Sequence, residues 1–383
     1  MSTFLVVLFW SAIALIAYIF VGYPLVLALW SALRPRPWRR EASEPSISIV
    51  IAAHNEAGSI ASKIHNLLSL DYPADRLEIL VGSDGSTDRT VEQLHQVSDR
   101  RLRVFVFPDR RGKPTALNTL IPKARGEIIV LADVRQTFDS QAVRALVRSF
   151  ADPRVGAVTG ELVMTRNPGA GEESSASYWK YEKFVRSREC LVDSTIVVTG
   201  AIYAIRKTLF QSIPPDTIVD DLLIPMRIAR QGYRVVFERD ARAYETAAAA
   251  NRDFRRKVRT VSGAFQLFAR ERWLLHPLRN RLWWQTTSHK ALRLLVAPLQ
   301  VIAFTANVAL AHASAAYELI FIAQVLFYAG AIAGWILPQY WRKPMAVTFP
   351  YVFCLLSWAT VCAFVRWIMQ RQTVTWEKVT NSY

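Results

Sequence analysis

Hydrophobic positions follow two patterns along this chain. Long uninterrupted apolar runs lie near both ends, whereas the middle alternates short apolar runs with amphipathic stretches. The short runs SISIVIAA, LEILVGS, RVFVF and EIIVLA are typical of buried strands, and amphipathic helices are expected near residues 60–68, 87–98, 115–124 and 140–150. Strands that alternate with helices form βαβ units around a mostly parallel sheet. The middle of the chain is therefore predicted to be an α/β domain.

The first long run extends from Met1 to Leu33 without a charged side chain. It exceeds the roughly 20 apolar residues that cross a bilayer, which predicts a transmembrane helix. A cleaved signal peptide fits less well, because the run is too long and no basic segment precedes it. The run is followed instead by four arginines, which place residue 34 on the cytoplasmic side: Arg34, Arg36, Arg39 and Arg40.

Three further segments of membrane-spanning length are expected at 292–313, 317–337 and 345–368. The loop between the last two, Gln339 to Pro344, contains arginine and lysine, as a cytoplasmic loop should. Four spans would place the tail outside, although its Arg371 and Lys378 favour the cytoplasmic side. If one segment were interfacial, the tail would be cytoplasmic, so the side of the membrane on which the C-terminus lies is not predicted.

Composition narrows the possible partners. The chain has 383 residues with 47 Lys+Arg and 31 Asp+Glu, a net charge of +16, and 52% of its residues are hydrophobic. The positive charge suits an anionic partner, and the hydrophobic fraction favours a membrane surface over nucleic acid. No nucleic-acid-binding motif or clustered basic stripe is evident. The cysteines Cys190, Cys354 and Cys362 show no metal-ligand spacing. They also imply no disulfide framework, which agrees with a reducing cytoplasm for the middle domain.

Polar residues follow the predicted strands at the edge where ligands of α/β sheets bind. His54, Asn55 and Glu56 follow the first strand, the segment 83–88 follows the second, and Asp133 follows the fourth. Helix capping accounts for Thr87 or Asp88 but explains Asp84 and Glu56 less well. Neither GxGxxG after the first strand nor GxxxxGK[ST] occurs, which argues against a dinucleotide dehydrogenase and a P-loop nucleotidase.

At this point the chain resembles the membrane-bound family 2 glycosyltransferases, which have the GT-A fold. The motifs IVIAAHNEAGSI, VGSDGSTDRT, RRGKPTALN, LADVRQTF, TGAIYAIRK and IVDDLLIPMRIARQGYRVVFE occur in the order typical of that family. The terminal helices are similar to those of synthases of cellulose, chitin-like oligomers, hyaluronan or poly-N-acetylglucosamine. The resemblance covers residues 46–265 and implies an enzyme that transfers sugar from a nucleotide sugar.

The resemblance assigns a role to each matching residue. Asp221 would be the catalytic base that deprotonates the acceptor hydroxyl, and one in-line displacement would invert the anomeric centre. Lys113 would lie near the diphosphate, and Asp133 would bind Mg²⁺ or Mn²⁺. The residues expected at the nucleotide sugar are His54, Glu56, Asp84, Lys113, Asp133 and Arg259, and those expected at the acceptor are Gly200, Tyr203 and Asp220. Plainer alternatives are a solvated lysine at 113, a turn glycine at 200 and a helix cap at 220.

Two positions depart from the family pattern. Where processive members have Gln-x-x-Arg-Trp, this chain has Arg256-Lys257-Val258-Arg259-Thr260, which puts processivity in doubt. Where members have Asp-x-Asp, this chain has Asp133 and then Arg135. One carboxylate can still hold magnesium together with substrate phosphates. Arg135 would then form a structural ion pair or add positive charge at the leaving group. The alternative is a metal-independent enzyme in which Arg135 replaces the cation.

The expected domain boundaries follow from the spans and the motifs. We predict a first helix with its basic flank at 1–40, the GT-A domain at 46–265, interfacial helices at 266–290, three transmembrane helices at 291–370 and a tail at 371–383. The predicted function is inverting transfer from a nucleotide sugar, expected to be a UDP-sugar, to a growing β-linked polysaccharide or oligosaccharide of the cell envelope, on the cytoplasmic face of a bacterial inner membrane. Coupling of this transfer to export is left open. Transfer of one sugar to a lipid-linked acceptor and a non-catalytic membrane scaffold are the alternatives. The sugar, linkage, acceptor, oligomeric state and protein partners are not predicted.

Overall fold

The computed structural model describes residues 3–165, 173–246, 250–337 and 344–371. Its chain forms two compact units. The sheet unit comprises Pro35–Thr165 and Glu189–Ala247, and the helical unit comprises Met1–Arg34, Arg166–Arg188 and Ala248–Arg371. The predicted domain boundary at 265 therefore falls inside the helical unit. The predicted loop 339–343 and the tail from 372 onward lie outside the described residues.

The sheet unit contains one mixed sheet with the strand order β3-β2-β1-β4-β7-β6-β8-β5. The pairs β1–β2, β1–β4, β2–β3 and β6–β8 are parallel, whereas β7 is antiparallel to β4 and β6, and β5 is antiparallel to β8. The α/β prediction is confirmed. The bounds are β1 Ile47–Ala53, β2 Leu77–Asp84, β3 Leu102–Phe107, β4 Ile128–Ala132, β5 Thr137–Phe138, β6 Val155–Thr165, β7 Ile202–Arg206 and β8 Arg234–Thr246.

The helices of the sheet unit follow the strands as the sequence predicts. Their bounds are α3 Ile60–Leu68, α4 Thr90–His95, α5 Lys113–Lys123, α6 Ala142–Val147 and α8 Asp220–Arg230. Every residue of β1 is buried, which explains its continuous apolar sequence. Because β1, β2 and β4 are parallel, their carboxyl ends share one edge of the sheet. The loops after these three strands therefore form the floor of the candidate site.

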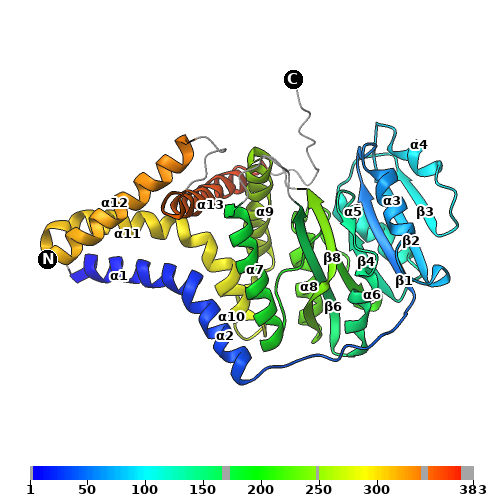
Figure 1. Cartoon of the computed structure of the whole chain (residues 1–383), viewed down its shortest axis with the longest axis horizontal. Coiled ribbons are helices and arrows are strands. Elements are labelled where there is room, and N and C mark those ends of the chain that lie inside the picture. Colours follow the sequence, from blue (N-terminus) through cyan, green and yellow to red (C-terminus); the bar gives the residue numbers. More distant parts are fainter. Residues whose placement is uncertain (1–2, 166–172, 247–249, 338–343, 372–383) are drawn as a thin grey trace. The chain divides into compact units, whose positions relative to one another are not determined.

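The helical unit contains four helices long and apolar enough to cross a membrane, at Thr3–Leu33, Trp283–Ala313, Ala315–Ile336 and Met345–Ile368. The first consists of α1 (Thr3–Ala17) and α2 (Tyr23–Leu33), joined by a π-helical turn at 18–22. The second contains α11 (Val296–Leu310). The third and fourth are α12 (Ala315–Ile336) and α13 (Met345–Ile368). α1 lies beside α11, with Phe9 and Ala12 packed against Ala303 and Ala306 (Figure 1). The four apolar helices are confirmed.

The second apolar helix begins earlier than the sequence suggests. Part of the segment predicted to be interfacial, from Trp283 onward, continues through α10 (Trp283–Thr286) and a π-helical turn at 287–291 into the candidate span. Inside the helical unit, this turn is held to α7 (Glu173–Val192) by a buried ion cluster. Glu182 of α7 is 2% exposed and contacts both His289 and Arg293. A charged group buried among apolar helices needs such partners, because its desolvation is otherwise very costly.

Candidate active site

Asn55 connects the loops that follow β1 and β2. Its backbone has a φ of 52°, a left-handed conformation that asparagine tolerates better than most residues. Its Oδ1 atom accepts a hydrogen bond from the backbone N–H of Thr87 at 2.7 Å. His54 donates from Nδ1 to the carbonyl oxygen of Asp84, also at 2.7 Å. Asn55 and His54 thus hold the two loops together, and Asn55 is a positioning residue to which the sequence analysis assigned no role.

Asp84 does not point openly at a ligand. Its side chain is 1% exposed, and its two oxygen atoms accept hydrogen bonds from the backbone N–H groups of Arg111 at 2.8 Å and Gly112 at 2.7 Å. These bonds hold the loop in front of α5, which gives Asp84 a positioning role, and its expected contact with the nucleoside base stays a prediction. Gly85 permits this close approach, since a Cβ atom there would lie 2.5 Å from the backbone nitrogen of Arg110.

Lys113 begins α5 and is buried among acids. Its Nζ atom lies 2.9 Å from Oδ1 of Asp133 and 3.3 Å from Oδ2 of Asp220, with 8% of the residue exposed. Burial opposes the charge of Lys113, but Asp133, Asp220 and Asp221 together hold its pKa above the usual range. The alternative of a solvated lysine is excluded by this placement. Asp220, expected at the acceptor, is 6% exposed and serves as an internal partner of Lys113.

Gly200 marks the place where two acids meet. A Cβ atom at Gly200 would lie 3.5 Å from Oδ2 of Asp221 and 3.6 Å from Oδ2 of Asp133. The two carboxylate oxygens are thus no farther apart than the sum of these distances. Asp221 lies in the first turn of α8, where a negative charge is favoured by the helix dipole. The structure therefore brings together the predicted base, the predicted metal ligand and the predicted glycine of the acceptor motif.

Tyr203 does not contact an acceptor in the way the sequence analysis expects. Its side chain is 0% exposed in β7, where it pairs with Leu131 of β4 and Thr159 of β6. Burial, with Asp220 and Asp221 nearby, raises the pKa of its hydroxyl well above the ordinary value. The hydroxyl oxygen is buried without a hydrogen-bond partner among the described residues. We therefore assign Tyr203 to the packing beneath the acids and correct its role as an acceptor contact.

Arg135 forms an ion pair with another predicted site residue. Its guanidinium nitrogen lies 3.4 Å from Oε1 of Glu56, and 52% of the arginine side chain is exposed against 16% for the glutamate. Of the two roles predicted for Arg135, this contact favours the ion pair. An exposed pair of this kind contributes little to stability, on the order of 0–1 kcal/mol. Its position at the strand ends makes it part of the candidate site surface.

Arg259 lies on α9 (Ala250–Arg270), in the helical unit. Its expected contact with the diphosphate stays a prediction, because the other site residues belong to the sheet unit.

Lys63 is a buried cation beneath the loop that carries Asp133 and Arg135. Its Nζ atom donates to the carbonyl oxygen of Gln136 at 2.7 Å and lies 3.9 Å from the ring centre of Phe138. The sequence analysis missed it, although its place on the apolar side of α3, three residues after Ile60, was a visible signal. Burial lowers the pKa of Lys63 to about 7, against an opposing contribution from Asp133.

This pKa predicts a pH-dependent stability. Between pH 7 and pH 10 the unfolded chain keeps the Lys63 proton and the folded protein loses it, so the free energy of unfolding should rise with pH. We expect a gain of about 2 kcal/mol from pH 7 to pH 9, by about 1.4 kcal/mol per unit of pKa shift. Chemical unfolding of the wild type and of Lys63→Met, followed across this range, should show the rise only in the wild type. The exposed-site control Lys123→Met should retain it, and an equal slope in Lys63→Met would contradict the prediction.

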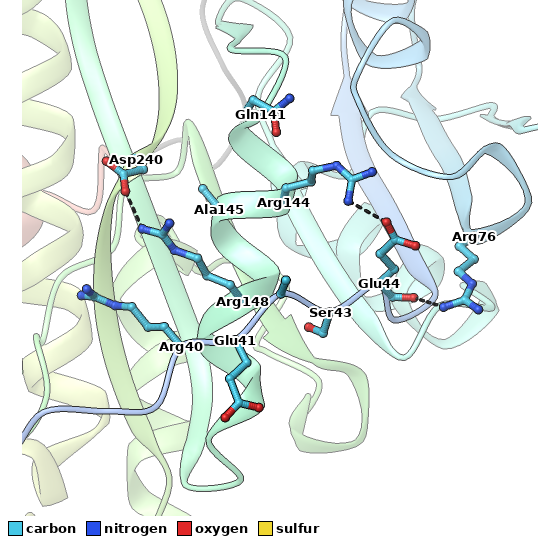
Figure 2. A pocket seen from close by; sticks show the side chains of 11 residues that line it. Arg40, Glu41, Ser43, Glu44, Arg76, Gln141, Arg144, Ala145, Arg148 and Asp240 are labelled. Carbon is cyan, nitrogen blue, oxygen red and sulfur yellow. Dashed lines mark hydrogen bonds and ion pairs between the residues drawn. The ribbon is translucent and has the colours of Figure 1, made fainter.

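A concavity of about 850 Å³ lies near the amino ends of β1 and β2, away from the candidate site (Figure 2). Its lining includes Glu44, three residues before β1, and Arg76, directly before β2, whereas the candidate site lies where these strands end. Figure 2 shows two ion pairs in its wall, between Arg144 and Glu44 and between Arg148 and Asp240. These mutual contacts fix the linker between the first apolar helix and β1. We assign the concavity no part in the chemistry.

The mixed sheet with acids at the carboxyl ends of its strands is the GT-A glycosyltransferase fold. It matches the solved mannosyltransferase PcManGT from Pyrobaculum calidifontis, in complex with GDP-Man and Mn²⁺, with a TM-score of 0.73, over 95% of this chain and 100% of that chain, at 24% sequence identity. The model of the family described as Glycosyl transferase family 2 matches residues 48–213. Residues 48–213 are therefore similar to the domain of that family.

Two curated relatives are similar to half of the chain. The poly-beta-1,6-N-acetyl-D-glucosamine synthase of Staphylococcus aureus (strain MSSA476) is 25% identical over 50% of this chain and 48% of its own length. The probable glycosyltransferase YdaM of Bacillus subtilis (strain 168) is 26% identical over 52% of this chain and 50% of its own length. The chain thus spans about half the length of the curated relatives it matches.

Proposed function

We propose that this protein is an inverting membrane glycosyltransferase that transfers a sugar from a nucleotide sugar to a glycan or lipid-linked acceptor. The observation that carries the proposal is the meeting of Asp133 and Asp221 at Gly200, beside the buried Lys113. The family 2 domain and the GT-A fold supply the reaction class. The four apolar helices supply the membrane association.

The position of Asp221 supports the proposal that it acts as the general base. Its Oδ2 atom borders the open position at Gly200, where the backbone presents no side chain to exclude an acceptor hydroxyl. A carboxylate there can accept the hydroxyl proton while the oxygen attacks the anomeric carbon. Attack from the face opposite the leaving diphosphate inverts that centre, so an α-linked donor gives a β-glycoside.

A divalent cation fits this site only together with the substrate. No group of three or more His, Cys, Asp or Glu side chains among the described residues could hold a metal by itself. Asp133, however, binds Lys113 through Oδ1 and borders Gly200 through Oδ2, so one oxygen atom could hold Mg²⁺ or Mn²⁺ beside the donor phosphates. When bound, the metal would neutralise charge on the leaving diphosphate. The ion pair with Lys113 keeps Asp133 oriented. The ion pair with Glu56 keeps Arg135 away from the proposed metal position.

The donor and acceptor are proposed from the relatives. The name of the synthase relative, poly-beta-1,6-N-acetyl-D-glucosamine synthase, favours a β-linked polysaccharide as the product. We propose a UDP-sugar as the donor and the cell envelope as the destination of that product. The basic residues that follow the first apolar helix favour a cytoplasmic sheet unit at a bacterial inner membrane. Transfer of a single sugar to a lipid-linked acceptor is the second candidate, because α9 lacks the glutamine and tryptophan of the processive signature.

The test is release of nucleoside diphosphate by the full-length protein in lipid vesicles. The donor panel should contain UDP-N-acetylglucosamine, UDP-glucose and GDP-mannose, each with Mg²⁺, Mn²⁺ or EDTA and with glycan and lipid acceptors. We expect release with one donor, loss of release with EDTA, and a raised metal requirement in Asp133→Asn. Product length would separate a polymer from a single transfer. Absence of release from every donor would favour the non-catalytic scaffold, and activity in EDTA would overturn the metal role of Asp133.

A further inference from the structure

A crevice of about 360 Å³ lies within the helical unit, between α9 and α13. Its volume is within the range of small-ligand sites. Two of the residues that line it are arginines from different helices, Arg255 of α9 and Arg366 of α13. The other six are apolar or weakly polar: Phe254, Val258, Trp358, Val361, Cys362 and Val365. The crevice therefore combines an apolar surface with two positive charges.

The walls of the crevice are held by close packing of the two helices. Ala359 and Ala363 of α13 are four residues apart and nearly fully buried, and their small side chains let α9 approach. Val258 fills the contact between them, and the hydroxyl group of Ser262 donates to the carbonyl oxygen of Ala363 at 2.7 Å. Phe265 stacks on Trp367 with ring centres 5.8 Å apart. The crevice is therefore a fixed feature of the helical unit.

The outer surface of the crevice suits the hydrocarbon part of a bilayer. α13 is one of the four membrane-span candidates. Trp358 is 59% exposed and Val365 is 43% exposed, although both side chains are apolar. Apolar exposure of this extent on a spanning helix is expected where lipid chains cover it. The occupant that fits this surface has a hydrocarbon chain.

The two arginines of the crevice indicate that its ligand also has an anionic group. Arg255 and Arg366 are both exposed, and neither forms an ion pair with another described residue. An uncompensated arginine beside the hydrocarbon region is costly, and a phosphate group removes that cost by pairing with the guanidinium. Basic pockets between membrane helices bind lipid head groups for this reason. The expected ligand is therefore amphipathic, with an anionic phosphate joined to a long apolar chain.

We infer that the crevice between α9 and α13 is a binding site for an anionic phospholipid of the surrounding bilayer. Its acyl chain lies against Trp358 and Val365, and its phosphate pairs with Arg255 and Arg366. The phospholipid is retained as a bound component and takes no part in a covalent step. The inference does not depend on sugar transfer, because the crevice is built entirely within the helical unit.

The experiment measures binding of phospholipid to the full-length protein. Protein in nanodiscs of phosphatidylcholine, with or without phosphatidylglycerol, is extracted, and the retained lipid is counted by native mass spectrometry. Quenching of tryptophan fluorescence by brominated phosphatidylglycerol gives an apparent affinity. The test variant is Arg255→Gln with Arg366→Gln. The matched control removes the same charge from exposed arginines elsewhere in the helical unit, Arg272→Gln with Arg279→Gln.

We expect the wild type and the control to retain phosphatidylglycerol in preference to phosphatidylcholine. The test variant should bind it on the order of tenfold to thirtyfold more weakly, at about 1 kcal/mol for each arginine near an anionic surface. Equal loss in test and control variants, or no preference for phosphatidylglycerol, would overturn the inference. Displacement by inorganic phosphate alone would identify a phosphate site instead of a lipid site. A changed oligomeric state with unchanged lipid would show that the crevice joins copies of this chain.

Discussion

Replacement of Asp221 by asparagine is expected to lower kcat about 10³-fold while donor binding changes little. Asparagine has nearly the shape of aspartate but cannot accept a proton from the acceptor hydroxyl, and general-base catalysis contributes roughly 10²–10⁴-fold. Asp221 borders the open position at Gly200, and Lys113 is held mainly by Asp133 and Asp220. The substitution should therefore leave the site assembled. Initial rates of diphosphate release and calorimetric titration with the donor would measure the two effects.

The control for this prediction is Asp75→Asn, which removes the same charge at an exposed position before β2. It should leave kcat and donor binding unchanged. The pH dependence gives a second readout, because loss of the base should also remove the rise in rate with pH that its ionisation produces. A rate for Asp221→Asn close to that of the wild type would show that another group acts as the base.

Replacement of Gly200 by alanine is expected to lower activity on the order of 10²-fold in a protein that still folds. The added methyl group would lie 3.5 Å from Oδ2 of Asp221 and 3.6 Å from Oδ2 of Asp133, which are ordinary contact distances. It would nevertheless occupy the space between the two acids, where a misplacement of about 1 Å can cost 10²-fold in rate. The backbone of Gly200 is outside the left-handed region, so alanine adds no backbone strain.

Gly58→Ala is the matched control, because a Cβ atom at Gly58 meets nothing within 4 Å. Both variants should unfold at nearly the same temperature as the wild type, since a compatible Gly→Ala change is neutral or slightly stabilising. Only Gly200→Ala should lose activity. Full activity of Gly200→Ala would mean that the reacting groups meet elsewhere, and a large fall in its unfolding temperature would mean that Gly200 is mainly structural.

The sequence indicated where the candidate site residues lie along the chain, but not which residues contact them. Asp133 and Asp221 were identified from their motifs, and the structure brings them together at Gly200. Asp84 and Tyr203 were predicted to contact ligands, but they are 1% and 0% exposed. Their motif positions specify where they lie along a strand, whereas exposure depends on which chain segments cover that strand. Lys63 was missed for the same reason, because its partners come from the distant loop at 136–138.

The sequence by itself determined the elements of this protein and their order. The apolar periodicity is a local property, so it was enough to predict the α/β unit, the four apolar helices and the acids after the strands. Only the tertiary structure decided the ion partners: Lys113 with Asp133 and Asp220, and Arg135 with Glu56. It also decided that Arg255 and Arg366 line one crevice. The energy of an ion pair depends on the distance between the two charges, and for residues far apart in the sequence only the packing of the chain sets that distance.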